Sequence, residues 1–183
     1  MAKFIDCSKA YSRSDDEILV RCSCGAEMVS FAFTKMKVED KEMETLLVTT
    51  ATPFVEKIKA KDTVSFRMMF PSEGAIELFY NIIKRKLNGG NGCVESLLGS
   101  LLGIQTTMND DGNPDGICLM GFNSVKDFTK YNKAKEGKED KYLAWEVYLD
   151  EKSYGALITQ LDKIVAKRYP DFREEKQPED GEE

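Results

Sequence analysis

Residues 63–87 read TVSFRMMFPSEGAIELFYNIIKRKL and contain two periodicities in succession. As far as Phe70, apolar residues occupy every second position, which is the pattern of a strand with one face on a core. After Pro71 and Ser72 the apolar residues recur every three or four positions, which predicts a helix with Ser72 as its cap. The apolar positions of this helix are Ile76, Phe79, Tyr80, Ile83 and Leu87. The stretch therefore predicts a strand that leads directly into a helix.

Three further segments with strand character precede this unit. Apolar and other residues alternate over 17–24 and again over 28–34, which predicts two strands. Residues 46–50 form a third predicted strand, and the charged stretch 35–44 is expected to connect it to the second. With the strand and the helix above, these segments predict a ββββα unit over residues 17–90.

The second half of the chain repeats this order less regularly. Residues 117–122 and 141–150 are predicted strands, and residues 151–168 have the apolar periodicity of a helix that Asp150 can cap. The apolar stripe of this helix is Tyr154, Leu157, Leu161, Ile164, Val165 and the aliphatic stem of Arg168. A short helix is expected in the charged segment 123–140, through Val125 and Phe128. The two halves share negligible sequence identity, so the repeat is one of topology.

The predicted fold class is α+β, with an antiparallel, β-rich body and two main helices. The body is expected to be a single domain over 1–173, with ββββα-like halves at 17–90 and 91–173. An OB-like barrel is the alternative architecture. No apolar run approaches the ~20 residues that cross a bilayer, so no membrane contact is expected. The N-terminal residues lack the apolar core of a signal peptide, which favours an intracellular, cytoplasmic protein, in a host cell if the chain is phage-encoded.

Charge is concentrated at the C-terminus. The chain has a net charge of −6, and residues 174–183 hold six acids and one lysine, a net of −5. A short run of like charges without apolar anchors is not expected to order, so 174–183 is predicted to be a mobile acidic tail. Such a tail either recruits a partner protein or competes with an anionic ligand for a cationic face of its own domain. A solubilising terminus is the simpler interpretation.

The composition also narrows the chemistry. The chain has no histidine, which excludes a Ser-His-Asp triad, a Cys-His pair and any imidazole metal ligand. Of the five cysteines only Cys22 and Cys24 form a close pair, and zinc sites normally need two pairs with wider spacing. We therefore expect no enzymatic activity, no cofactor and no metal. A zinc site at this pair, completed by Cys7 with Cys93 or Cys118, is the alternative.

The segment 111–116 reads DGNPDG and matches the first half of a calcium loop. The twelfth position of that loop should be a bidentate acid and is Phe122, and Pro114 falls inside the loop. Asp-Gly and Asn-Pro dipeptides form turns by themselves, so a turn is predicted here.

Cationic side chains are predicted on the outward faces of several strands. Lys57, Lys59 and Lys61 alternate, so on an extended segment they project from one face at ~6.6 Å intervals. That interval is close to the phosphate spacing of an extended nucleic-acid strand. Arg21 and Arg67 fall on the outward sets of two other predicted strands.

Aromatic side chains are predicted beside these cations. Tyr142 and Tyr148 lie on the face of their predicted strand opposite Trp145. A sheet face with lysine or arginine beside exposed rings can bind single-stranded nucleic acid, because the cations follow the backbone and the rings stack on bases. The alternative is a solvated sheet face, whose edge lysines protect against aggregation.

The β-rich body and the tail 174–183 together resemble the layout of single-stranded DNA-binding proteins of phage and bacterial replication, whose acidic C-termini recruit partners. The ββββα-like halves also resemble the PC4 and Whirly folds, in which strands bind the nucleic acid and helices pack behind them. The resemblance implies single-stranded DNA as ligand and a protein partner for the tail, and it allows a homo-oligomer.

We therefore predict a non-catalytic protein that binds single-stranded DNA. The alternative is a small interaction or inhibitor protein of the phage or mobile-element type, which acts through protein contacts alone. The absence of a recognisable catalytic constellation is compatible with both.

Overall fold

The computed structural model describes residues 16–22, 28–38, 40–51, 65–84 and 92–172. Within these ranges the chain forms two four-stranded antiparallel sheets and three α-helices, which confirms the predicted α+β fold class. The described strands make two separate sheets and no closed barrel, so the OB-like alternative is wrong for this part of the chain.

Each sheet takes its strands in chain order. The first sheet, sheet A, consists of β1 (Glu17–Arg21), β2 (Met28–Val38), β3 (Lys41–Ala51) and β4 (Ser65–Phe70). The second, sheet B, consists of β5 (Gly92–Glu95), β6 (Leu101–Met108), β7 (Pro114–Phe122) and β8 (Trp145–Asp150).

A helix follows each sheet, as predicted, and a third helix is inserted into the second half. α1 (Glu73–Lys84) follows β4, and α3 (Glu151–Arg168) follows β8. α2 (Val125–Lys133) and the 3₁₀ turn η3 (Asp140–Tyr142) lie between β7 and β8. The predicted caps of the two main helices are present. The Ser72 Oγ accepts a hydrogen bond from the Ala75 amide, and the Asp150 carboxylate accepts one from the Ser153 amide.

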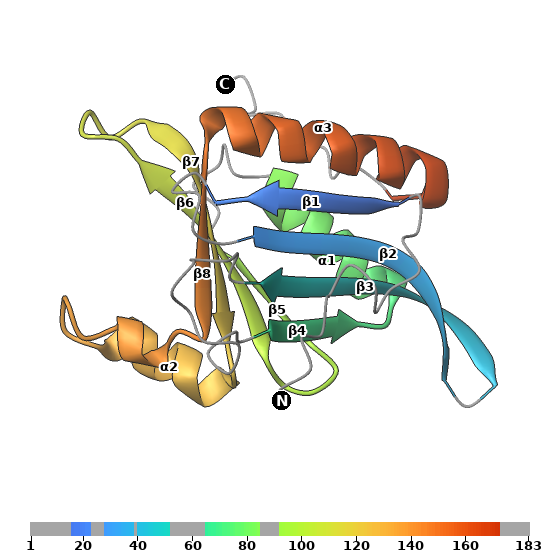
Figure 1. Cartoon of the computed structure of the whole chain (residues 1–183), viewed down its shortest axis with the longest axis horizontal. Coiled ribbons are helices and arrows are strands. Elements are labelled where there is room, and N and C mark those ends of the chain that lie inside the picture. Colours follow the sequence, from blue (N-terminus) through green and yellow to red (C-terminus); the bar gives the residue numbers. More distant parts are fainter. Residues whose placement is uncertain (1–15, 23–27, 39, 52–64, 85–91, 173–183) are drawn as a thin grey trace, which may run out of the picture.

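The two sheets share one core. Figure 1 shows the strands of sheet B nearly perpendicular to those of sheet A, with α3 along the β1 edge of sheet A and α1 behind that sheet. One buried cluster takes side chains from both sheets, from α1 and from α3. α3 contacts β1 of the first half as well as β7 and β8 of the second. None of the helices in the described ranges has the length and apolar character that spanning a bilayer requires.

The charged stretch 35–44 forms part of a hairpin, so the predicted connection there is wrong. β2 and β3 stay paired from Met28 and Ala51 out to Val38 and Lys41. Lysines on one strand face acids on the other, so opposite charges pair across the strands. The Lys35 Nζ, for example, lies 3.9 Å from a Glu42 carboxylate oxygen.

The predicted strand 141–150 begins later than expected, at Trp145. The Leu143 amide donates to the Asp140 carbonyl and closes the turn η3, and regular pairing with β7 follows it. Trp145 pairs with Gly121, and a Cβ at position 121 would lie 1.9 Å from the indole Nε1. Glycine is therefore required at 121, because any side chain there would collide with the indole.

A cluster of charges joins the end of α3 to sheet A. The Arg168 guanidinium donates to Asp16 at 2.9 Å, to Glu44 at 2.6 Å and to the Phe33 carbonyl at 3.0 Å. The Tyr169 hydroxyl donates to the same Glu44 carboxylate at 2.8 Å. Sequence periodicity assigned only the aliphatic stem of Arg168 to the apolar stripe of the helix. Its charged end, only 17% exposed as a side chain, connects three chain segments far apart in sequence.

This cluster predicts a loss of stability in acid. The hydrogen bond from Lys167 is the largest influence that lowers the pKa of Asp16. Burial raises the pKa of Glu44, but hydrogen bonds from Arg168 and Tyr169 outweigh burial and leave it lowered. A carboxylate with a lowered folded-state pKa stabilises the fold above its unfolded pKa, near 4, and loses that contribution as the pH falls through the folded value. The free energy of unfolding should therefore decrease below about pH 4.

The measurement is urea denaturation between pH 6 and pH 3, on the wild type and on an Asp16→Asn, Glu44→Gln double variant. The double variant should be less stable at neutral pH and should lose less stability on acidification. A control variant with Asp110→Asn and Glu95→Gln, both exposed, should follow the wild type. Parallel curves for the wild type and the Asp16, Glu44 variant would contradict the assignment.

The core face of α3 gives a second stability prediction. Leu161 is fully buried, and Leu157 and Ile164 lie on the same buried face, as their spacing predicted. Leu161→Ala should lower the free energy of unfolding by about 2–5 kcal/mol, because it removes apolar contacts and leaves a cavity. Gln160→Ala, at an exposed position of the same helix, should change it by less than about 0.5 kcal/mol. Equal effects in chemical denaturation would show that this face is not core.

Candidate nucleic-acid interface

The predicted cationic residues belong to the first half of the chain. Arg21 lies in β1 and Arg67 in β4, the two edge strands of sheet A, with β2 and β3 between them. The described structure does not include the side chains of either arginine. Lys57, Lys59 and Lys61 lie outside the described residues.

The predicted aromatic residues belong to the second half. Tyr148 lies in β8 and alternates with the buried Trp145 and Val147, so it occupies the opposite face of sheet B, as predicted. Tyr142 is in η3 and not in the strand, which corrects the prediction for that residue. The two predicted arginines therefore lie on strands of sheet A, whereas Tyr148 lies on a strand of sheet B.

Sheet B has a second face, which turns away from the shared core. We call it the outer face. The pairing register and the alternation along each strand define its positions as Cys93, Glu95, Leu101, Gly103, Gln105, Thr107, Gly116, Cys118, Met120, Phe122, Glu146, Tyr148 and Asp150. Gln105, Cys118 and Tyr148 are paired in register and form one row across three strands.

α2 covers part of the outer face. The Ser124 Oγ accepts a hydrogen bond from the Asp127 amide and caps the helix. Phe128 and Tyr131 are one turn apart and pack edge-on against Phe122, with ring centroids 5.2 and 5.3 Å away. These contacts join Leu101 and Met120 in a small second apolar cluster, separate from the shared core.

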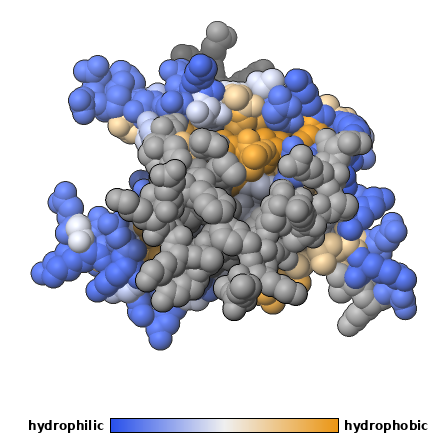
Figure 2. All heavy atoms as spheres, in the orientation of Figure 1, coloured by the Kyte–Doolittle hydropathy of each residue, from blue (hydrophilic) through white to orange (hydrophobic). Residues whose placement is uncertain are grey.

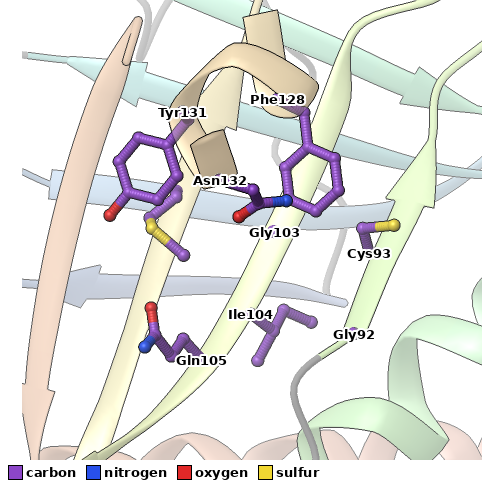
Figure 3. A pocket seen from close by; sticks show the side chains of 9 residues that line it. Gly92, Cys93, Gly103, Ile104, Gln105, Phe128, Tyr131 and Asn132 are labelled. Carbon is purple, nitrogen blue, oxygen red and sulfur yellow. The ribbon is translucent and has the colours of Figure 1, made fainter. Parts of the chain in front are cut away.

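A groove of about 450 Å³ remains beside α2. Its lining residues from the strands are Gly92, Cys93, Gly103, Ile104, Gln105 and Met120, and those from α2 are Phe128, Tyr131 and Asn132. Figure 3 shows the rings of Phe128 and Tyr131 with the Asn132 amide between them, close to Gly103, and the Gln105 amide below the Tyr131 ring. Gly103 pairs with Cys93 on one side and with Met120 on the other, so the floor has no side chain where its neighbours have one.

The groove combines apolar and uncharged polar groups, and none of its described lining residues carries a formal charge. Burial raises the pKa of the Tyr131 phenol, so it stays protonated at neutral pH. Beside the groove, burial raises the pKa of the Cys118 thiol to about 12, which leaves that cysteine a poor nucleophile. What the groove offers is flat apolar walls, two amides and a hydroxyl, a lining suited to an uncharged planar ring.

Cations lie around this site instead of inside it. Residues 125–142, which include α2 and η3, hold six lysines and four acids, a net of +2. Lys126, Lys130 and Lys133 are exposed on α2. The ammonium groups of Lys130 and Lys141 lie 5.7 and 4.8 Å from the centre of the Tyr142 ring, within cation–π range.

Sequence reasoning missed most of the groove. Phe128 and Tyr131 are an aromatic pair at helical spacing inside an otherwise charged segment, and that pattern could have indicated a packing face. Gln105 and Asn132 carry no local signal, since only the sheet register and the position of α2 bring them together.

Cys22, one of the two candidate zinc ligands, is buried where the end of β1 meets β8. Its Sγ accepts a hydrogen bond from the Tyr148 amide at 3.3 Å. Cys7 and Cys24 lie outside the described residues. Among the residues that are described, no three acids or cysteines are grouped as metal ligands. At the 111–116 turn, the Asn109 side chain accepts hydrogen bonds from the amides of Asp111 and Asn113, so this segment is a turn as predicted.

Comparison with known proteins finds no matching family model, no matching curated protein and no matching solved structure.

Proposed function

We propose that this protein binds single-stranded nucleic acid, with DNA as the first candidate, and that it does so without catalysis. The supporting observation is the gathering of four aromatic rings on the α2 side of sheet B. These rings are Phe128, Tyr131, Tyr142 and Tyr148. Rings with accessible faces bind unpaired bases by stacking, and stacking tolerates any base because every base has a π-face.

Lysines on the same segment supply the second requirement. The ammonium groups of Lys130 and Lys141 lie over the Tyr142 ring, so a base that takes the place of one of them on the ring would have its own phosphates close to both lysines. Phosphate contacts give most of the sequence-independent affinity in such complexes. The local excess of lysine compensates for a chain whose net charge is −6.

In this proposal, sheet A and the segment before β4 supply further cationic residues. Arg21 and Arg67 lie on edge strands of that sheet, and Lys57, Lys59 and Lys61 precede β4 in the chain. A strand of several nucleotides could pass from one sheet to the other, because Cys22, directly after β1, contacts β8 through the Tyr148 amide. The acidic tail 174–183 is proposed to recruit a protein partner or to compete with the strand for these cations.

A second candidate function is a protein contact without nucleic acid. The connection between β5 and β6 exposes two adjacent leucines, Leu97 by 58% and Leu98 by 83%. The Leu97 amide donates to the Met69 carbonyl at 2.8 Å, which fixes this loop against β4. Leu19 of β1 is also 62% exposed, and Figure 2 shows apolar surface on the same side of the molecule as α3. Apolar side chains held rigidly in water are typical of protein interfaces.

Salt dependence tests the proposed phosphate contacts. Fluorescence titration of a thirty-base oligothymidylate at several salt concentrations should give binding that weakens as salt is added. Lys130→Ala with Lys141→Ala should flatten the logarithmic salt slope by about 0.7 for each phosphate that is no longer neutralised. The control, Lys152→Ala with Lys163→Ala, removes two exposed lysines from α3 and should leave the slope unchanged.

Two results would count against the proposal. Equal slopes for both double variants would remove Lys130 and Lys141 from the interface. No detectable binding at low salt, by the full chain and by a variant that ends at residue 173, would exclude the nucleic-acid function and leave the protein-contact function ahead.

The ring of Tyr148 gives a test of stacking. Tyr148→Ala should weaken oligothymidylate binding by about 1–3 kcal/mol, with little change in salt slope, because stacking releases few counterions. Tyr148→Phe keeps the ring and should bind almost as well as the wild type. Because Tyr148 also packs against the core, urea denaturation must show that both variants are folded under the titration conditions. An equal decrease of affinity in the two variants would assign the effect to the hydroxyl and contradict stacking.

A further inference from the structure

The groove beside α2 has the size and the wall chemistry of a site for one planar ring. Its volume of about 450 Å³ is within the ~300–1,000 Å³ usual for small-ligand sites. The rings of Phe128 and Tyr131 and the thioether of Met120 form its walls, and these groups favour contact with aromatic faces. The floor at Gly103 has no side chain of its own, and the Phe122 ring and the Met120 side chain lie beside this buried position.

Two amides face this space without partners in the described part of the chain. Gln105 comes from β6 and Asn132 from α2, and both line the groove; Figure 3 shows the Asn132 amide between the two rings and the Gln105 amide below Tyr131. Each primary amide offers two N–H donors and a carbonyl acceptor. The edge of a nucleobase presents donors and acceptors side by side, which is the pattern that asparagine and glutamine match in nucleic-acid complexes.

The distribution of charge orients the ligand. The described lining of the groove is uncharged, whereas Lys126, Lys130 and Lys133 are exposed on α2. A phosphate is therefore favoured on the lysine side of the helix, and an uncharged base is favoured in the groove. This arrangement suits a strand whose backbone crosses α2 and whose base turns inward.

We propose that the groove over Gly103 is a pocket for one base of the bound strand, and that Gln105 and Asn132 hydrogen-bond to the edge of that base. The inference rests on the proposed function. It adds hydrogen bonds that recognise the edge of a base, whereas the proposed site otherwise binds through stacking and charge.

The test uses a strand in which a single residue carries a base. The probe is a fifteen-residue abasic deoxyribose-phosphate chain with one central thymine. The matched probe carries 2,4-difluorotoluene, which has the shape of thymine and lacks its hydrogen-bonding edge. The wild type should bind the thymine probe roughly threefold to tenfold more tightly, the range expected for one neutral hydrogen bond. Gln105→Ala and Asn132→Ala should each reduce this ratio towards one, and Gln160→Ala, at an exposed position on α3, should preserve it.

A second variant tests the floor of the pocket and leaves both amides in place. A Cβ at position 103 would lie 3.1 Å from a Phe122 ring carbon, so Gly103→Ala needs only a small shift of that ring. The added methyl group makes the floor shallower. Binding of the thymine probe should therefore weaken severalfold, while binding of the fully abasic chain should not change. Equal weakening of both probes would overturn the assignment of this floor to a base.

Failure of this inference is distinguishable from failure of the proposed function. If oligothymidylate binds but the wild type does not distinguish thymine from difluorotoluene, the pocket is wrong and strand binding stands. If oligothymidylate itself does not bind at low salt, both are wrong. Millimolar thymidine should change strand binding by less than twofold. Complete displacement by thymidine would identify a free-nucleoside site and overturn the assignment to a strand.

Discussion

The fold depends on a core that neither half of the chain encloses by itself. The inner faces of sheet A and sheet B are buried in one cluster with α1 and α3. α3 follows β8 in the chain and yet contacts β1, so the second half supplies a helix that covers the first. A four-stranded sheet with a single helix leaves apolar area in water, and sharing the core removes that cost for both halves. The hydrogen bonds from Arg168 to Asp16 and Glu44 set the position of α3, because they fix the end of this helix on sheet A.

One face of sheet B belongs to the shared core. The other face is partly covered by α2, which is inserted between β7 and β8. α2 has only nine residues, and the strand of sheet B that it contacts most is β7. The helix covers Phe122 through Phe128 and Tyr131, and it does not reach across the rest of the sheet. The groove is therefore a consequence of covering a sheet with a short helix. Gly103, which has no side chain, lines the groove beside α2.

The sequence predicted those parts of the fold that depend on local periodicity. The stripes Ile76, Phe79, Tyr80 and Ile83 in α1 and Leu157, Leu161 and Ile164 in α3 were identified because helical spacing is visible without a partner. The segment 35–44 was misread because its charges are explained only by the facing strand, where Lys35 approaches Glu42. Tyr142 was assigned to a strand because alternation continues through a turn that local composition does not mark. The groove was not predictable in this way, since Gln105 and Asn132 meet only through sheet register and helix placement.

The charge of the chain bears on how the proposed site would work. A protein of net charge −6 offers no general attraction to a polyanion, and at physiological salt a charge is largely screened beyond about 8 Å. Attraction must therefore come from groups close to the strand, such as Lys130 and Lys141 beside Tyr142. When few cations are available, stacking and hydrogen bonds to bases carry a larger share of the binding free energy, and these contacts do not attract the backbone of a duplex whose bases are paired. A weakly charged, ring-rich site of the proposed kind would thus favour unpaired strands over duplex, and the proposed competition by the acidic tail would strengthen that preference by opposing contacts that rest on charge alone.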